Sequence, residues 1–247
     1  MRELFDLLAP YVIRVLPGFL LGLAAIFFFR KAKDTRIFIY ILLFILFRDT
    51  MTPLGFWRFG SEGLFWMRFI ESPLFLLVFG LVCIGITLSL YFLDKPNQKL
   101  FLWKKGSSIK LVLSGIVGAL VVTAPLMLLY QFVPIASRGG AVSPRLLPFI
   151  LFFAVAGNFM EEGIFRGYVR GRLAEFHSPL KAALLSGLVF AFCHIFLATT
   201  VTNAGWPLLL FALWEGLIVG VIGMKHGVLA SSITHGGAIF ILSSGLV

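Results

Sequence analysis

The chain has 247 residues, of which 60% are apolar and only 13% are charged, and its mean hydropathy is +1.00. An average soluble domain has about 45–50% apolar and about 25% charged residues, so this composition excludes an ordinary soluble globular protein. The 28 Phe, 5 Trp and 5 Tyr residues also exclude a disordered chain. We therefore expect an all-α fold, a polytopic transmembrane helical bundle in the lipid bilayer.

A membrane-spanning helix needs about 20 mostly apolar residues, and the sequence contains eight such windows. Between the second and the third, the segment from Thr50 to Glu71 combines Pro53, Trp57, Arg58, Trp66 and Arg68. This mixture is typical of an aromatic stretch at the membrane interface. The windows lie near residues 9–29, 37–57, 73–93, 111–133, 147–168, 179–199, 206–224 and 227–246.

The Lys and Arg residues are distributed unevenly over the connections between the windows. The connections near residues 30–36, 94–110, 166–181 and 225 hold 14 of the 21 cations, and the alternate set, which includes the start of the chain, holds 7. Cytoplasmic loops are enriched in Lys and Arg, so both termini are expected outside the cytoplasm. We predict an integral protein of a bacterial-type plasma (inner) membrane, and we attribute the net charge of +10 to orientation, with no nucleic acid as partner.

A basic, polar loop from Asp94 to Lys110 divides the chain in two. Residues 1–110 are expected to form N-terminal transmembrane helices and this loop, and residues 111–247 hold nearly all the candidate chemistry. Cys83 and Cys193 lie in apolar windows without metal-ligand spacing, so we expect neither a disulfide nor a cysteine-based zinc site.

Ionisable side chains inside membrane spans are costly and are therefore candidates for function. In the fifth window, Asn158 precedes the adjacent acids Glu161 and Glu162, and Arg166 follows them. Glu162 and Arg166 are four residues apart, so they share a helix face and are expected to form an ion pair. Glu161 points about 100° away and has no local partner, as a general base requires. The structural alternative is a helix end whose acids meet cytoplasmic cations.

Two histidines lie inside later windows. His194 follows Phe190 by four residues, and His235 follows Ser231 and Ser232, whose hydroxyls are placed to fix its ring. Taken singly, each histidine is as compatible with a structural role as with a catalytic one. Helical bundles build sites from inward side chains of facing helices, so the histidines and the acids of the fifth window together predict one site.

Two chemistries suit this set. In the first, Glu161 and His194 orient and deprotonate a water that attacks a peptide carbonyl, while His235 donates to the oxyanion. In the second, Glu161, His194 and His235 bind a catalytic zinc. The His-Glu-x-x-His signature of zinc peptidases is missing, so we expect no cofactor and keep zinc as the alternative. Glu215 is a second acid lining the cavity, a proton carrier, or a partner for Arg48 or another intramembrane cation.

Three motifs occur in order on successive windows: Glu161-Glu162-x-x-x-Arg166, Phe190-x-x-x-His194, and His235 in the last window. This part of the chain resembles the CAAX protease and bacteriocin-processing (CPBP, or Abi) family of intramembrane proteins, which includes the type II CAAX prenyl endopeptidases. The resemblance implies that Glu161 and His194 activate water, that Glu162 pairs with Arg166, and that His235 stabilises the oxyanion. It further implies a peptide or membrane-protein substrate, with Phe190 and Asn158 as supporting residues.

Position 239 departs from the family pattern, since it is Ile where the family has Asn or Asp four residues after the last histidine. Loss of one oxyanion donor costs about 100- to 1000-fold in rate, unless Asn158, Thr234, Ser231 or a backbone N–H replaces it. The departure argues against taking prenylated CAAX tails as the substrate. It also keeps open a non-catalytic membrane immunity or scaffolding protein of the same fold. A transporter that uses Glu161, Glu215 and the histidines as a proton relay is a further alternative.

Overall fold

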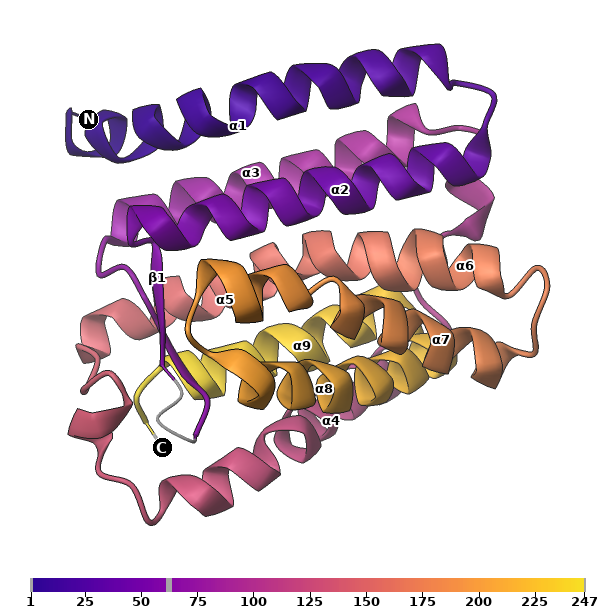
Figure 1. The fold of residues 1–247 in the computed structure, drawn as a ribbon. Helices are drawn as coiled ribbons and strands as arrows, with labels where there is room; N and C mark the ends of the chain where they lie inside the picture. Colours follow the sequence, from indigo (N-terminus) through magenta and orange to yellow (C-terminus); the bar gives the residue numbers. More distant parts are fainter. Residues whose placement is uncertain (1, 61–63, 247) are drawn as a thin grey trace.

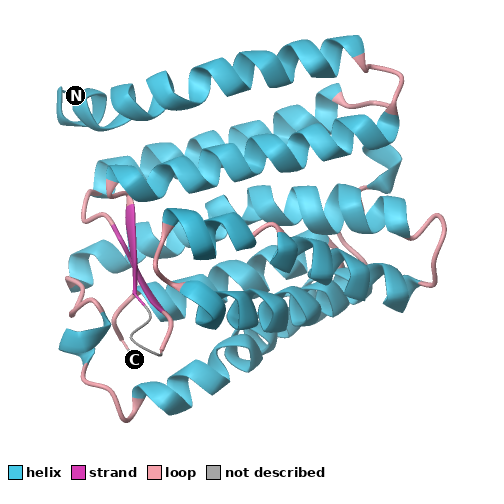
Figure 2. Cartoon of the chain, in the orientation of Figure 1, coloured by secondary structure: helices cyan, strands magenta, loops and turns pink. Residues whose placement is uncertain are grey.

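The computed structural model describes residues 2–60 and 64–246, which form a bundle of helices with one small β-hairpin (Figures 1 and 2). The predicted all-α class is therefore confirmed. The two strands are β1 (Trp57–Gly60) and β2 (Trp66–Phe69). The helices are α1 (Arg2–Phe28), α2 (Lys33–Met51), α3 (Pro73–Leu93), α4 (Ser108–Tyr130), α5 (Leu147–Glu162), α6 (Arg170–Leu173), α7 (Pro179–Phe192), α8 (Gly205–His226) and α9 (Val228–Ser243).

Seven helical segments in the described part of the chain are long and apolar enough to cross a membrane. One of them, Pro144–Leu173, runs through α5, a π-helical segment (Gly163–Val169) and α6. The predicted window at 73–93 coincides with α3. The eighth window corresponds to α9, which is apolar but only 16 residues long.

Serine side chains cap the N-termini of three of these helices. Ser72, Ser107 and Ser178 each accept a hydrogen bond from the backbone N–H three residues later. A serine at this position satisfies one of the N–H groups that a helix leaves without an internal partner. Pro73 and Pro179 then occupy the first helical position, where a missing N–H does no harm. Local sequence thus fixes where α3, α4 and α7 start.

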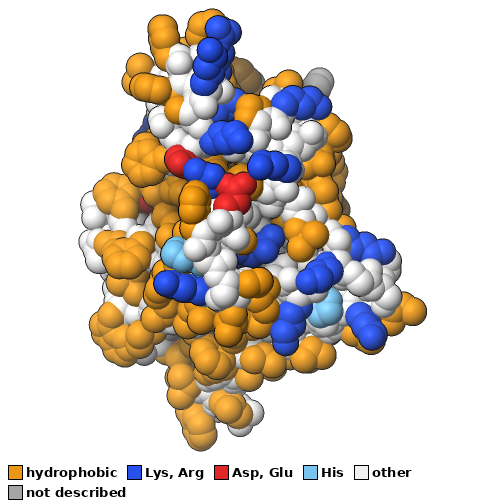
Figure 3. Space-filling view, turned by 90° about the vertical axis from the view of Figure 1, so that its right-hand side faces the viewer, with side chains coloured by type: hydrophobic (Ala, Val, Ile, Leu, Met, Phe, Trp, Pro, Cys, Tyr) orange, Lys and Arg blue, Asp and Glu red, His pale blue; other side chains and the backbone are white. Residues whose placement is uncertain are grey.

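The helices are arranged so that α5 lies between α3 and α9, while α7 packs against α8 and α4 against α9. α1 is outermost and packs against α2 (Figure 1). Both termini lie at the same end of the bundle, and the connections α1–α2, α3–α4, α6–α7 and α8–α9 lie at the other end. Figure 3 faces that second end and shows Lys and Arg side chains gathered on it.

The segment after α2 folds as a β-hairpin, which the sequence did not predict. β1 and β2 are antiparallel, with Trp57 opposite Phe69. Phe65, Met67 and Phe69 alternate along the chain and are all buried, as expected for one face of a strand. Trp57 and Trp66, the aromatic residues that suggested a membrane interface, are half-buried, and the interfacial position of the segment stays a prediction.

Arg68 shows how the hairpin is held. Its side chain is 2% exposed, and its Nη1 donates to the carbonyl of Leu242 at 2.8 Å, at the end of α9. Its Nε donates to the carbonyl of Gly140 at 3.0 Å. Burial lowers the pKa of the Arg68 guanidinium. The hairpin is thus tied to the C-terminal part of the chain.

Helices α7 and α8 approach closely where two glycines meet. A Cβ atom on Gly216 would lie 2.7 Å from the carbonyl oxygen of Gly187, nearer than any real Cβ contact. Small residues allow membrane helices to pack backbone to backbone in this way. The contact places the residues around Gly216 next to those of α7 and the π-helical segment.

Candidate active site

A cavity of about 80 Å³ lies inside the bundle. Its walls come from α2, the hairpin, α3, α5, α8, α9 and the segment after α7, so both predicted parts of the chain line it. The boundary near residue 110 stays a prediction. A cavity of this size has room for several waters where polar side chains line it. The polar residues that line it are Arg48, Asn158, Glu161, His194, Glu215 and His235.

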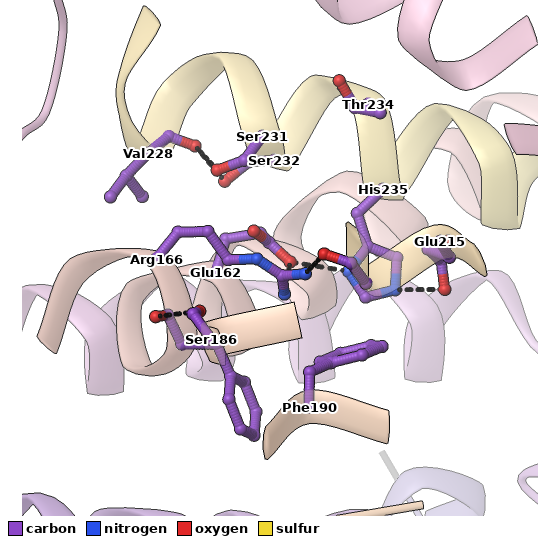
Figure 4. Close-up of polar contacts among 12 residues, drawn as sticks. Glu162, Arg166, Ser186, Phe190, Glu215, Val228, Ser231, Ser232, Thr234 and His235 are labelled. Atoms are coloured by element: carbon purple, nitrogen blue, oxygen red, sulfur yellow. Dashed lines mark hydrogen bonds and ion pairs between the residues drawn. The ribbon is translucent and has the colours of Figure 1, made fainter. Parts of the chain in front are cut away.

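Glu162 is the centre of a buried cluster, shown in Figure 4. Its side chain is fully buried, and its Oε1 accepts a hydrogen bond from Arg166 Nη1 at 2.9 Å. The same oxygen accepts from His235 Nδ1, also at 2.9 Å. The predicted Glu162–Arg166 ion pair is therefore present, and it is extended by a histidine that the sequence did not connect to it.

Arg166 is held from three sides. Its Nη2 donates to the carbonyl of Gly216 at 2.8 Å, and its guanidinium carbon lies 4.7 Å from the centre of the Phe190 ring. The Phe190 ring also meets the His235 ring edge to face, with centres 5.4 Å apart. Phe190 thus packs against Arg166 and His235, the two residues that hydrogen-bond to Glu162. This is the position expected of a supporting residue.

Glu215 joins the cluster from α8. Its Oε2 lies 3.4 Å from His235 Nε2, and its side chain is buried (Figure 4). The suggested pairing of Glu215 with Arg48 is wrong, whereas its position in the cavity wall is confirmed. Both ring nitrogens of His235 therefore face carboxylates. Nδ1 donates to Glu162, and Nε2 faces the Glu215 carboxyl group.

The hydroxyls near His235 do not contact its ring. Ser231 and Ser232 both donate to the carbonyl of Val228 at 2.9 Å, as Figure 4 shows. The expectation that they fix the ring is wrong, because a helical serine reaches the carbonyl three or four residues back more easily than a neighbouring side chain. The two carboxylates of Glu162 and Glu215 hold the ring instead.

Glu161 differs from its neighbour Glu162, as the helical spacing predicts. It lines the cavity and is 9% exposed, and its Oε2 is buried without a hydrogen-bond partner. It lies in the last turn of α5, directly before the π-helical segment. Such irregular turns in helices are frequent at functional sites.

His194 presents a second free acceptor to the same cavity. Its Nδ1 donates to the carbonyl of Phe190 at 2.9 Å, and this bond leaves Nε2 with its lone pair. No hydrogen bond to Nε2 is found among the described residues. His194 lies just beyond the end of α7, where the regular helix stops. Glu161 and His194 thus share one cavity, both with acceptors that other groups leave free.

The side chains proposed to replace the missing Asn at position 239 are occupied. Asn158 lines the cavity, but its Nδ2 donates to the carbonyl of Ala154 at 2.6 Å. Thr234 donates to Ala230, and Ser231 bonds within its own helix. Ile239 itself lines the cavity. Thr234 and Ser231 therefore offer no donor to the cavity, whereas the bond to Ala154 uses only one of the two hydrogens of Asn158 Nδ2.

The zinc alternative needs Glu161, His194 and His235 to aim lone pairs at one point. Within the residues that the structure describes, no three His, Cys, Asp or Glu side chains are grouped in that way. Both nitrogens of His235 already face carboxylates. The residues therefore do not fit a zinc site in this arrangement, and the absence of any cofactor stays a prediction.

Arg48 is a site residue that the sequence analysis did not identify, since it was counted with the orientation charges. It is 3% exposed and lines the cavity. Its Nε contacts Asp49 Oδ1 at 2.7 Å, and its Nη2 donates to the carbonyl of Cys193 at 2.7 Å. Its position inside an apolar window was a signal that could have revealed it, because a charge there is costly.

The fold and the site define a polytopic helical membrane protein with a carboxylate–histidine centre inside the bundle. The family model described as type II CAAX prenyl endopeptidase, Rce1-like, matches residues 143–241, from the connection before α5 into α9. The predicted resemblance to CAAX-type proteases is thereby confirmed for this part of the chain. No curated protein and no solved structure matches the chain. Because the family is one of proteases, the match supports a peptidase, whereas the roles of individual residues rest on geometry.

Proposed function

We propose that this protein is an intramembrane endopeptidase that hydrolyses a peptide bond of a membrane-associated protein or peptide. The observation that carries the proposal is that Glu161, whose carboxylate has no hydrogen-bond partner among the described residues, and His194, whose Nε2 has none, line one cavity. Two acceptors on one cavity are what a water molecule needs to be held and activated, because it donates two hydrogen bonds.

In the proposed reaction, the water donates one hydrogen to Glu161 and one to His194. Its oxygen attacks the peptide carbonyl carbon as Glu161 takes the proton, and the carbonyl electron pair moves onto oxygen. The C–N bond then breaks as Glu161 returns the proton to the leaving nitrogen. One water and one peptide bond give one carboxyl group and one amine, so the steps balance.

The remainder of the cavity wall is apolar. Phe65, Met67 and Phe69 of the hairpin segment line it together with aromatic residues of α2 and α3. Such a wall favours a substrate with apolar residues around the cleaved bond. We therefore propose the broad class of membrane-associated peptides and membrane proteins as substrates.

We further propose that the protein lies in a bacterial-type plasma membrane, with both termini outside the cytoplasm. The gathering of Lys and Arg at the end opposite the termini supports this orientation (Figure 3). We expect activity from a C-terminally fused reporter of a kind that works only outside the cytoplasm. A cytoplasmic reading would reverse the orientation.

A non-catalytic immunity or scaffolding protein is the second candidate. It is favoured by Ile239, which leaves the family's last polar position apolar, and by His235, whose nitrogens both face carboxylates. Such a protein would hold a peptide in the cavity without cutting it. It predicts that loss of the Glu161 carboxylate leaves the biological phenotype unchanged.

The test is a comparison of membrane-protein termini by mass spectrometry in cells that carry wild type, Glu161→Ala or Glu71→Ala. Glu71 is an exposed acid away from the cavity and serves as the matched control. We expect at least one terminus that is present with wild type and Glu71→Ala and lost with Glu161→Ala. Identical termini in all three, at equal expression, would contradict an endopeptidase.

A further inference from the structure

An endopeptidase of the proposed kind needs a hydrogen-bond donor for the oxyanion that forms on the carbonyl oxygen. The donors expected from the sequence are not free. His235 gives Nδ1 to Glu162 and turns Nε2 toward Glu215. Position 239 is Ile, and one of the two hydrogens of Asn158 Nδ2 is used within its own helix. A second donor in the cavity wall, and a charged one, comes from α2.

Arg48 has such a donor. Its guanidinium is buried in the cavity wall, and its Nη1 has no hydrogen-bond partner. The other two nitrogens are engaged, Nε with Asp49 and Nη2 with the carbonyl of Cys193. An unpaired N–H group in a buried place costs about 1–3 kcal/mol. This cost is recovered when a ligand oxygen binds there.

The position of Arg48 relative to the water-activating pair supports a catalytic use. The carbonyl that Nη2 binds belongs to Cys193, the residue directly before His194. One short backbone segment therefore holds both the free nitrogen of His194 and the guanidinium of Arg48. Glu161 and His194 line the same cavity as Arg48, so the three residues border one volume.

We infer that Arg48 supplies the oxyanion donor in place of the missing Asn at position 239. This inference rests on the proposed endopeptidase function. As water attacks, the carbonyl oxygen gains negative charge and accepts from Arg48 Nη1, and the bond relaxes when the C–N bond breaks.

A substrate carboxylate is a less suitable ligand. The Nε–Nη2 edge, which could bind a carboxylate through two parallel N–H groups, already binds Asp49 and the carbonyl of Cys193. The adjacent Asp49 also balances the charge of Arg48. A single free nitrogen suits a single oxygen.

The experiment uses the full-length protein in an Asp49→Asn background, so that removing Arg48 leaves no unpaired buried acid. Three forms are compared: Asp49→Asn as reference, Arg48→Met/Asp49→Asn, and the same double variant with Ile239→Asn. The substrate is a synthetic peptide that spans the terminus lost with Glu161→Ala. kcat, KM and the melting temperature are measured in detergent for each form.

We expect Arg48→Met to lower kcat about 100- to 1000-fold with little change in KM, because the bond forms only in the transition state. Adding Ile239→Asn should raise kcat at least about tenfold above that of the double variant, since it returns a donor to the cavity wall. A purely structural Arg48 would not be rescued in this way. If the Met form fails to fold, Arg48→Lys, which keeps the charge but changes the donor geometry, replaces it with the same expected rescue.

Three outcomes overturn the inference: an unchanged kcat without Arg48, a loss confined to KM, or no rescue by Ile239→Asn in folded protein. A loss confined to KM would assign Arg48 to substrate binding. The proposed function fails separately, if Glu161→Ala changes no terminus in cells. An effect of Glu161→Ala without an effect of Arg48 removes only the oxyanion role.

Discussion

The cluster around Glu162 and the open side of the cavity at Glu161 differ sharply, although the two glutamates are neighbours in sequence. Glu162 accepts from Arg166 and His235, and the cluster continues to Glu215. Glu162 Oε2 also lacks a partner, but Glu161 has no hydrogen-bond partner at either oxygen among the described residues, and His194 leaves Nε2 free. The residues of the Glu162 cluster hydrogen-bond to one another. Glu161 and His194 instead have acceptors that are available to a molecule in the cavity.

This difference shows how a helical bundle separates support from chemistry. A buried charge that has partners fixes the positions of its helices, and breaking such a pair is strongly destabilising. A buried acceptor without a partner costs about 1–3 kcal/mol, which the fold tolerates where a ligand or water later supplies the bond. We therefore expect the two groups to respond differently to substitution.

The largest effect on the hydrolysis rate is expected for Glu161 and His194, which lie on the open side of the cavity. Glu161→Ala and His194→Ala should each lower the hydrolysis rate by about 100- to 10,000-fold, because each removes a group that activates the same water. The double variant should lose little more than either single one. The rate is measured on the peptide spanning the cleaved terminus, with Glu71→Ala as control. Additive losses would show that the two residues act on separate steps.

The next largest effect is expected in the cluster. Arg166→Met leaves Glu162 buried with only His235 and should lower the free energy of unfolding by about 3–5 kcal/mol. Adding Glu162→Leu should recover part of this loss, because it removes the uncompensated charge. Thermal unfolding in detergent measures both. An Arg166→Met protein as stable as wild type would show that the ion pair does not support the fold.

A smaller effect is expected where α7 meets α8. Gly216→Ala places a Cβ 2.7 Å from the Gly187 carbonyl oxygen and should cost about 1–3 kcal/mol of stability as the helices move apart. Gly85→Ala in α3 is the matched control, since its Cβ meets nothing within 4 Å. Equal melting temperatures for the two variants would mean that α7 and α8 separate without cost.

The smallest effect is expected from metal removal. Because Glu161, His194 and His235 are not grouped as ligands in the described structure, strong chelation should leave the hydrolysis rate unchanged. The measurement is the rate before and after dialysis against a chelator, with metal analysis of the purified protein. Loss of activity that returns with one equivalent of zinc would restore the zinc alternative.

Much of the fold was predictable because a bilayer demands long apolar helices, and the third window coincided with α3. The hairpin was not predictable from composition, since the same Trp and Arg residues suit an interface as well as an interior. Its inward alternation, with Phe65, Met67 and Phe69 buried, depends on the helices that surround it. The hairpin is therefore determined by its tertiary contacts and not by its local sequence.

The site was predictable where neighbours in the helix interact. The Glu162–Arg166 pair follows from a spacing of four residues, and the divergence of Glu161 follows from a spacing of one. The contacts of Glu162 with His235 and of His235 with Glu215 join α5, α9 and α8, and no local pattern reveals them. Helix packing determines them.

The most direct test of the central claim compares Glu161→Gln with Glu162→Gln in the same detergent, with hydrolysis rate and melting temperature measured on each. Both substitutions remove one carboxylate charge and keep its shape. We predict that Glu161→Gln loses the rate at an unchanged melting temperature, whereas Glu162→Gln loses melting temperature. The account is contradicted if Glu161→Gln hydrolyses the peptide at the wild-type rate, or if it loses as much melting temperature as Glu162→Gln.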